Sequence, residues 1–133
     1  MLGTFFVLLY AAHHLSDYPL AYDHQAAHKA DRTLAGWKTN FVHAGTHILT
    51  TAALLAAATW LLPDVHPTTL GCTVALAWIG ASHSFIDRRW AVRWWMEHTG
   101  QRGYLQHGGA LTVDQAAHIG LGLLPAAFAL TAL

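Results

Sequence analysis

Four apolar runs separated by polar connections constrain the fold of this chain more than any other feature of its sequence. The runs cover residues 1–18, 41–62, 68–87 and 110–133. A helix of about 17 to 25 mostly apolar residues is long enough to cross the hydrocarbon core of a bilayer. The sequence therefore predicts an all-α protein with a single membrane domain, residues 1–133, built as a four-helix transmembrane bundle.

The composition supports a membrane location. Charged residues make up only 11% of the chain and hydrophobic residues 54%, whereas soluble domains carry about 25% charged residues. A soluble all-α bundle stays open as an alternative because the first run is short. The formal net charge is zero, which gives no reason to expect a nucleic-acid partner. We therefore expect the lipid bilayer to be the principal partner.

The two long polar connections each indicate a short helix. In the first connection, Leu20 to Asn40, a surface helix is predicted through Gln25 to Lys29. In the second, Arg88 to Gly109, tryptophans interleave with arginines. Both residue types are favoured at the headgroup level of a bilayer. The second connection thus predicts an amphipathic helix lying at the membrane interface, followed by a glycine-rich loop.

Each apolar run carries, at one end, a pair of histidine or aspartate residues spaced four apart. Residues four apart lie on one face of a helix, about one turn from each other. An imidazole and a carboxylate so placed can bind one metal ion, or can orient each other for proton transfer. The pairs are His13 with Asp17, His43 with His47, His83 with Asp87, and Asp114 with His118.

The four pairs are predicted to meet at one end of the bundle. They lie at the ends of the first and third runs and at the starts of the second and fourth, so antiparallel spans place all of them in one layer. All the basic residues fall in the two connections on the same side, and the positive-inside rule then predicts a cytoplasmic site in a bacterial inner membrane, with both termini outside. These residues are Lys29, Arg32, Lys38, Arg88, Arg89, Arg93 and Arg102.

This layer predicts a metal site, because ionisable residues inside membrane spans are costly and cluster where they serve a function. Imidazole and carboxylate ligands suit zinc best, with iron, manganese or nickel as alternatives, and there is no thiol cluster for an iron–sulfur centre. The number of candidate ligands is about twice what one tetrahedral zinc ion takes, so two ions are plausible. The candidate metal ligands are His13, His14, Asp17, His43, His47, His83, Asp87, Asp114 and His118.

The leading functional hypothesis is a metal-dependent membrane hydrolase acting on a lipid-linked or phosphate-bearing substrate. Metal ions would polarise a substrate oxygen and supply hydroxide. Asp17, Asp87 or Asp114 would bridge the metals or act as the base. Arg88 and Arg89, next to the site, could receive a phosphate or could serve as ordinary interfacial anchors.

Three other interpretations remain. A metal-ion or proton transporter or sensor would need a polar route to the opposite face, which Leu54 to Trp60 and Leu123 to Leu130 do not offer. A structural subunit held by a His/Asp network is the second, although such hydrogen bonds contribute only about 0.6 to 2 kcal/mol each in membranes.

Haem is a third interpretation of the site, and it is disfavoured because haem ligation does not require carboxylates at this spacing. A homo-oligomer stays open.

Five sequence blocks resemble an actinobacterial-type family catalogued as domain of unknown function 3307. The resemblance implies a small multi-span membrane protein of bacteria or their phages, with no established activity. Family members often carry Gln where this chain has Ala21. The blocks are His14-Leu15-Ser16-Asp17-Tyr18, His24-Gln25-Ala26-Ala27-His28-Lys29, His43 to His47, Ser82-His83 with Asp87-Arg88-Arg89, and Asp114-Gln115 with His118.

The same resemblance implies that the Gln25 to Lys29 stretch belongs to the site. It adds His24, Gln25, His28 and Gln115 to the secondary candidates, although the spacing of His24 and His28 also suits a solvated helix face. A more distant likeness to inner-membrane proteins labelled metal-dependent hydrolases, which distribute His and Asp over several spans, is an analogy at the level of architecture.

Overall fold

The structure, a computed structural model, describes residues 1–133 and contains helices but no strands. The all-α prediction is therefore confirmed. The elements in chain order are α1 (Leu2–Asp17), α2 (Asp23–His28), α3 (Leu34–Leu61), α4 (Thr69–Asp87), α5 (Trp90–His98), α6 (Arg102–Gln106), α7 (Ala110–Ala117), the π-helical turn η1 (His118–Leu123) and α8 (Leu124–Ala132).

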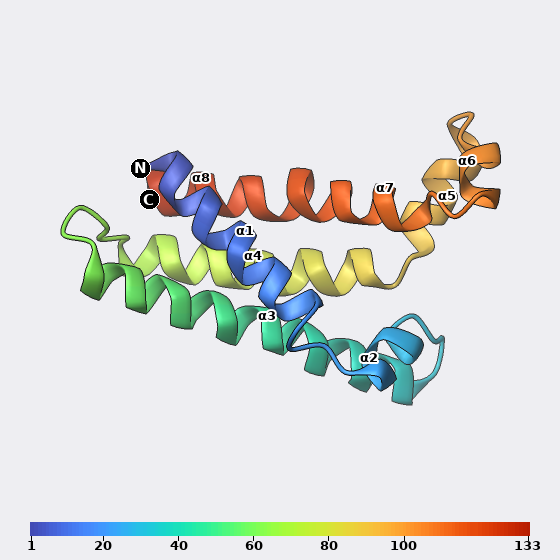
Figure 1. Ribbon diagram of the computed structural model, residues 1–133, viewed down its shortest axis with the longest axis horizontal. Coiled ribbons are helices and arrows are strands. Elements are labelled where there is room, and N and C mark those ends of the chain that lie inside the picture. Colours follow the sequence, from blue (N-terminus) through green and yellow to red (C-terminus); the bar gives the residue numbers. More distant parts are fainter.

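The long helices pack around a common interior. Helix α4 contacts both α3 and α8, and α1 lies across them, in contact with α3 and α8. The elements α7, η1 and α8 follow one another without a break and form one long helical rod. The short helices α2, α5 and α6 gather at one end of the molecule, and both chain termini lie at the other (Figure 1).

Three of these rods are long and apolar enough to cross a membrane: α3, α4 and the combined Ala110–Ala132 helix. Helix α1 has 16 residues and is shorter than the other three. The outward faces of the long helices carry large apolar side chains, such as Leu49, which is 72% exposed, and Trp60, which is 84% exposed. Apolar side chains therefore cover the outside of the molecule as well as part of its interior.

Local capping chemistry decides where the helices begin. The Thr33 side chain accepts a hydrogen bond from the Gly36 amide at 3.0 Å, which satisfies one of the free amides of the first turn. Helix α3 consequently starts at Leu34, not at Phe41 where the apolar run begins. In the second connection, α5 forms over the tryptophan-rich stretch, and α6 forms where the glycines suggested only a loop.

The π turn in the last long rod ends at Leu123, two residues before Pro125. Proline has no amide hydrogen, so the carbonyl of Leu121, four residues earlier, loses its usual helical donor. The indole Nε1 of Trp78 on α4 donates to this carbonyl at 2.9 Å. A side chain of the neighbouring helix therefore binds the backbone group that the proline leaves free, which ties α4 to the last rod.

The interior divides along the length of the helices. An apolar cluster fills the half near the chain termini, with Phe5, Leu9 and Leu130 among its most buried members. A smaller apolar cluster of Ile86, Val92 and Met96 lies under α5. The interior of the remaining half is formed by buried histidine and aspartate side chains, and these make up the candidate site.

Candidate metal centre

The structure brings together all four predicted pairs. Helices α1, α3 and α4 each contribute one pair, and the fourth pair spans α7 and the start of η1. The imidazole rings of these pairs lie against one another in the interior; for example, the ring centroids of His47 and His83 are 3.5 Å apart and those of His83 and His118 are 4.3 Å apart. The side chains are almost fully buried, with the Asp17 carboxylate the most exposed among those of the first three pairs at 8%.

A first group of possible metal ligands surrounds the carboxylate of Asp17. Its Oδ1 atom lies 3.2 Å from the Nε2 atoms of both His43 and His47, and 3.7 Å from that of His83. The four ligand atoms all lie within 4.8 Å of one another. Zinc bonds of about 2.0 to 2.1 Å in a tetrahedron place the ligand atoms about 3.3 Å apart. The spacing of this group therefore fits a small divalent cation.

A second group consists of His83, Asp87 and His118. The Nε2 atom of His83 lies 3.1 Å from Asp87 Oδ2, and that of His118 lies 3.8 Å from Asp87 Oδ1. His83 Nε2 thus faces the carboxylates of both groups. Because one imidazole nitrogen has one lone pair, His83 can serve only one of the two groups at a time.

Hydrogen bonds fix which nitrogen of His118 faces the centre. Its Nδ1 atom lies 3.0 Å from the carbonyl oxygen of Asp114, one turn earlier. A carbonyl only accepts, so Nδ1 donates, and in the neutral imidazole Nε2 carries the lone pair. The helix backbone thus orients His118 with its ligand atom toward Asp87, as a second contact commonly does for metal-binding histidines.

Gln115 settles the orientation of His13 in the same way. The Gln115 amide donates to Asp17 Oδ2 at 3.1 Å, which turns its carbonyl oxygen toward His13 Nε2 at 3.1 Å. His13 Nε2 also lies 3.2 Å from Asp17 Oδ2, and both neighbours are acceptors, so Nε2 carries the proton. In this arrangement His13 and Gln115 orient Asp17, and neither belongs to the two ligand groups.

His43 meets groups that cannot all be satisfied by hydrogen bonds. Its Nε2 atom lies 3.0 Å from the ammonium of Lys29, 3.2 Å from Asp17 Oδ1 and 3.3 Å from Asp87 Oδ2. A single ring nitrogen cannot both accept from an ammonium and donate to carboxylates. A cation between the imidazole and the carboxylates would remove this conflict.

Several buried polar atoms of the cluster have no hydrogen-bond partner within the chain. They include His118 Nε2 and Asp114 Oδ1. Buried polar groups are nearly always paired, and an unpaired one costs about 1 to 3 kcal/mol. Three carboxylates face one ammonium in this interior, so its fixed charge is negative when the imidazoles are neutral. The donor set and its charge therefore fit a bound divalent ion.

Some candidate residues lie outside the centre. His14 packs between Tyr10 and Tyr18 along α1, at ring-centroid distances of 4.3 and 5.5 Å. His24 and His28 pack on each other on exposed α2, where His28 Nδ1 lies 2.9 Å from Asp31 Oδ2.

Gln25 is buried but serves its own helix. Its side chain accepts from the Tyr22 amide at the start of α2. None of these four side chains, His14, His24, Gln25 and His28, lies in either ligand group.

Arg88 is occupied by structural contacts. It is 2% exposed, and its guanidinium donates to the carbonyls of Lys29, at 2.9 Å, and Asp31. The same guanidinium lies over the Trp37 ring, 4.1 Å from its centroid. Arg88 therefore holds the turn between α2 and α3, and only Arg89 of the predicted arginine pair is free to meet a phosphate.

The structure brings Lys29 to the site; it ends the Gln25 to Lys29 stretch that the family resemblance assigned there, but it was not among the candidate site residues. Its ammonium lies 2.8 Å from Asp87 Oδ1. It reaches the centre because Arg88 donates hydrogen bonds to the carbonyls of the turn that follows α2. The resemblance pointed to the stretch, but residue spacing alone did not predict this contact, since Lys29 stands among other charged residues of a polar connection.

A buried clamp between α3 and α4 was also missed. Asn40 donates to the Ser84 carbonyl at 3.2 Å, and the Ser84 hydroxyl donates back to Asn40 Oδ1. Here a signal existed, because Asn40 continues the helical stripe of His43 and His47 toward the start of α3. The clamp fixes the spacing of α3 and α4 next to the two ligand groups.

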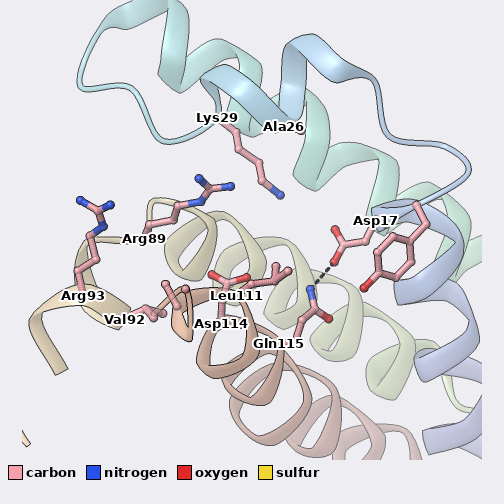
Figure 2. Close-up of a pocket in the computed structure, with 12 residues that line it drawn as sticks. Asp17, Ala26, Lys29, Arg89, Val92, Arg93, Leu111, Asp114 and Gln115 are labelled. Atoms are coloured by element: carbon pink, nitrogen blue, oxygen red, sulfur yellow. Dashed lines mark hydrogen bonds between the residues drawn. The ribbon is translucent and has the colours of Figure 1, made fainter. Parts of the chain in front are cut away.

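A pocket of about 430 Å³ opens beside the cluster. Figure 2 shows Asp17, Asp114 and Gln115 on one side of it and Lys29, Arg89 and Arg93 around the other. The Lys29 side chain extends from α2 toward the acidic side. The pocket thus joins two aspartates of the cluster to three basic side chains.

Comparison with known proteins identifies the family of this chain. A family model described as "Protein of unknown function (DUF3307)" matches residues 5–131. The resemblance seen in the sequence blocks is therefore confirmed over nearly the whole chain. No curated protein and no solved structure matches the chain.

Proposed function

Because this chain belongs to the DUF3307 family, for which no function is defined, we propose from its site that it is a metal-dependent hydrolase of a phosphate-bearing or lipid-linked substrate. The observation that carries the proposal is the pocket in which Asp17, a member of the first ligand group, and Asp114 lie opposite Lys29, Arg89 and Arg93. Acidic ligands on one side suit a divalent ion, and basic side chains on the other suit a phosphate.

We propose two three-residue centres. Asp17, His43 and His47 form one, and His83, Asp87 and His118 form the other, so that the shared nitrogen of His83 is used once. Catalytic zinc sites use three protein ligands and keep a fourth position for water or substrate. Zinc is the ion expected first, with iron, manganese and nickel as alternatives. When bound, such ions supply Lewis-acid polarisation and an activated water.

The chain's own residues take the other roles. Arg89 and Arg93 bind the phosphate, and Lys29 neutralises charge between the phosphate and Asp87. Asp114 lines the pocket, its Oδ1 atom has no partner within the chain, and it belongs to neither centre. Asp114 is therefore the residue proposed to take the proton of the attacking water. Gln115 and His13 hold Asp17 in position.

The finer architecture is also part of the proposal. We place α1 as a fourth span of a transmembrane bundle: 16 residues at a rise of about 1.5 Å reach about 24 Å, and a bilayer thins locally around a short span. The exposed Trp94 and Trp95 support a position of α5 at the headgroup interface. The basic residues support an orientation of the site toward the cytoplasm of a bacterial inner membrane. Carbonate extraction and reporter fusions test this placement.

Hydrolysis is preferred over transport because of the apolar cluster. Leu9, Leu55 and Ile79 fill the interior between the histidines and the opposite end, and an ion crossing that half would find no polar partner. The site is therefore proposed to open on one side only.

Elemental analysis of the protein, purified in detergent without a histidine tag, tests the proposal. We expect one or two transition-metal ions per chain in the wild type, and their loss in a His83→Ala/Asp87→Ala double variant. The matched control is Asp64→Ala/His66→Ala, which removes the same residue types from an exposed loop at the far end. Phosphate release from lipid phosphates should then depend on the metal and on Asp114. A metal-free wild type after growth and reconstitution with metal would refute the proposal.

A further inference from the structure

A second opening, much larger and almost wholly apolar, lies beside the polar pocket. This groove has a volume of about 920 Å³ and runs between α4, α5 and α7, within the range of about 300 to 1,000 Å³ usual for ligand sites. Its walls include Trp78 and Phe85 of α4, Trp94 and Trp95 of α5, and Val113 of α7. Ser82 is the one polar residue that lines it.

The groove and the polar pocket adjoin. Val92 of α5 lines both, and it is 6% exposed, which places it as the partition between them. Arg89, which precedes α5, and Arg93 of α5 line the pocket, whereas Trp94 and Trp95 of α5 line the groove. Helix α7 likewise presents Asp114 and Gln115 to the pocket, and Val113 and Ala116 to the groove. The same two helices thus build a charged site and an apolar site on either side of one valine.

We propose that the groove holds the hydrocarbon chain of the molecule whose phosphate enters the pocket. The substrate class is then a long-chain lipid phosphate, with the headgroup between Arg89, Arg93 and the acidic side and the chain along α4. This inference rests on the proposed function for the fate of the phosphate, but the binding of chain and headgroup as one ligand stands apart from hydrolysis. Charge complementarity in the pocket and continuity through Val92 favour this occupant over bulk lipid.

Photolabelling of the metal-free protein in lipid nanodiscs tests the inference without hydrolysis of the probe. The probe is hexadecyl phosphate with a diazirine at the end of the chain. We expect adducts on the α4 and α5 peptides that line the groove. Unlabelled hexadecyl phosphate should abolish them, whereas hexadecanol and inorganic phosphate at equal concentration should not. Equal competition by hexadecanol would show that the groove binds any hydrocarbon chain. Full competition by inorganic phosphate would show that only the headgroup is bound. Either result overturns the inference.

Two tryptophan substitutions supply the matched variants. Ala116 is exposed and lines the groove, so Ala116→Trp should fill it and lower labelling at least tenfold. Ala57 is exposed on α3, away from the groove, and Ala57→Trp should leave labelling unchanged. If Ala116→Trp fails to yield folded protein, Ala81→Phe fills the groove from α4 instead. Labelling that persists in a folded filled variant would refute the inference.

Different results would contradict the hydrolase proposal and the groove inference. If the protein retains no metal and releases no phosphate but shows the expected competition, hydrolysis fails and lipid-phosphate binding stands. If it hydrolyses ethyl phosphate and hexadecyl phosphate equally, and Ala116→Trp changes neither rate, the hydrolase stands and the groove inference fails.

Discussion

Leu9 and His13 are one turn apart on the same helix, and each is 1% exposed; they belong to opposite halves of the molecule. Leu9 lies in the apolar cluster near the chain termini, where carbon packs against carbon. His13 lies in the half where α1, α3, α4 and the last rod bury imidazoles and carboxylates. Apolar packing stabilises the first half whatever is bound, whereas the second half leaves polar atoms unpaired unless a cation joins them. One half therefore holds the helices together, and the other is free to carry chemistry.

The largest expected effect comes from removing the charge at the centre of the polar half. Asp17→Asn keeps the size of the side chain and can still accept from Gln115, but it no longer offers a carboxylate to the three imidazoles of the first ligand group. We expect metal affinity to fall more than about 100-fold, beyond the 10- to 100-fold typical of residues that only orient ligands. Metal competition titrations measure this, with exposed Asp64→Asn as control. Unchanged affinity would remove Asp17 from the ligands.

The second largest effect is a loss of stability that should differ between the metal-free and the metal-bound protein. Lys29→Met removes the ammonium that faces Asp87, and breaking a buried ion pair destabilises a protein by about 3 to 5 kcal/mol. We expect a loss of this size without metal and a smaller one with metal bound, because the ion then compensates Asp87. Unfolding in detergent with and without chelator measures both, and exposed Lys38→Met serves as control. Equal losses in the two states would argue against an ion at Asp87.

The apolar half should respond in the opposite way. Leu9→Ala opens a cavity in its cluster, and such substitutions lower the free energy of unfolding by about 2 to 5 kcal/mol. Metal content should stay at the wild-type value, because no ligand moves. Val7→Ala, on the exposed face of the same helix, should change neither quantity. A variant that unfolds easily and also loses metal would show that the two halves are coupled.

The smallest effect concerns a residue that only orients a ligand. Gln115→Ala removes the bridge between His13 and Asp17 and should weaken metal binding about 10- to 100-fold. The titration used for Asp17→Asn measures it, with Gln106→Ala on exposed α6 as control. An effect as large as that of Asp17→Asn would mean that Gln115 itself contacts the ion.

The helices and the grouping of the four pairs were predictable because both follow from periodicity. Apolar runs indicate helices, and a spacing of four places two side chains on one face. The same spacing could not tell His13 from His14, because the choice depends on how α1 packs across its neighbours. The structure turns His13 inward and leaves His14 between two tyrosines.

Contacts between the connections and the helices were out of reach of the sequence. Lys29 enters the site only because α2 folds back over α3, and Arg88 is buried only because two carbonyls and two tryptophan rings receive it. The polar connection predicted for Leu20 to Asn40 is shorter because Thr33 caps α3 early. Each of these outcomes depends on tertiary partners that no local pattern encodes.

The π turn η1 has a consequence for how this protein can tolerate insertions and deletions. Continued at α-helical spacing from His118, the inward positions would be Gly122, Pro125 and Ala129, about 100° per residue around the axis. The buried positions after His118 are Gly122, Leu123, Ala126, Ala127 and Leu130, so the middle of the buried face lies about one residue later than regular α-helical spacing predicts. A π turn accommodates one extra residue. The inward-facing side of the rod is therefore set by one register before η1, which turns Asp114 and His118 inward, and by another after it, which turns the apolar residues inward. Deleting Gly120 would make the helix regular. Either the His/Asp residues or the apolar residues of the rod would then face the interior, but not both.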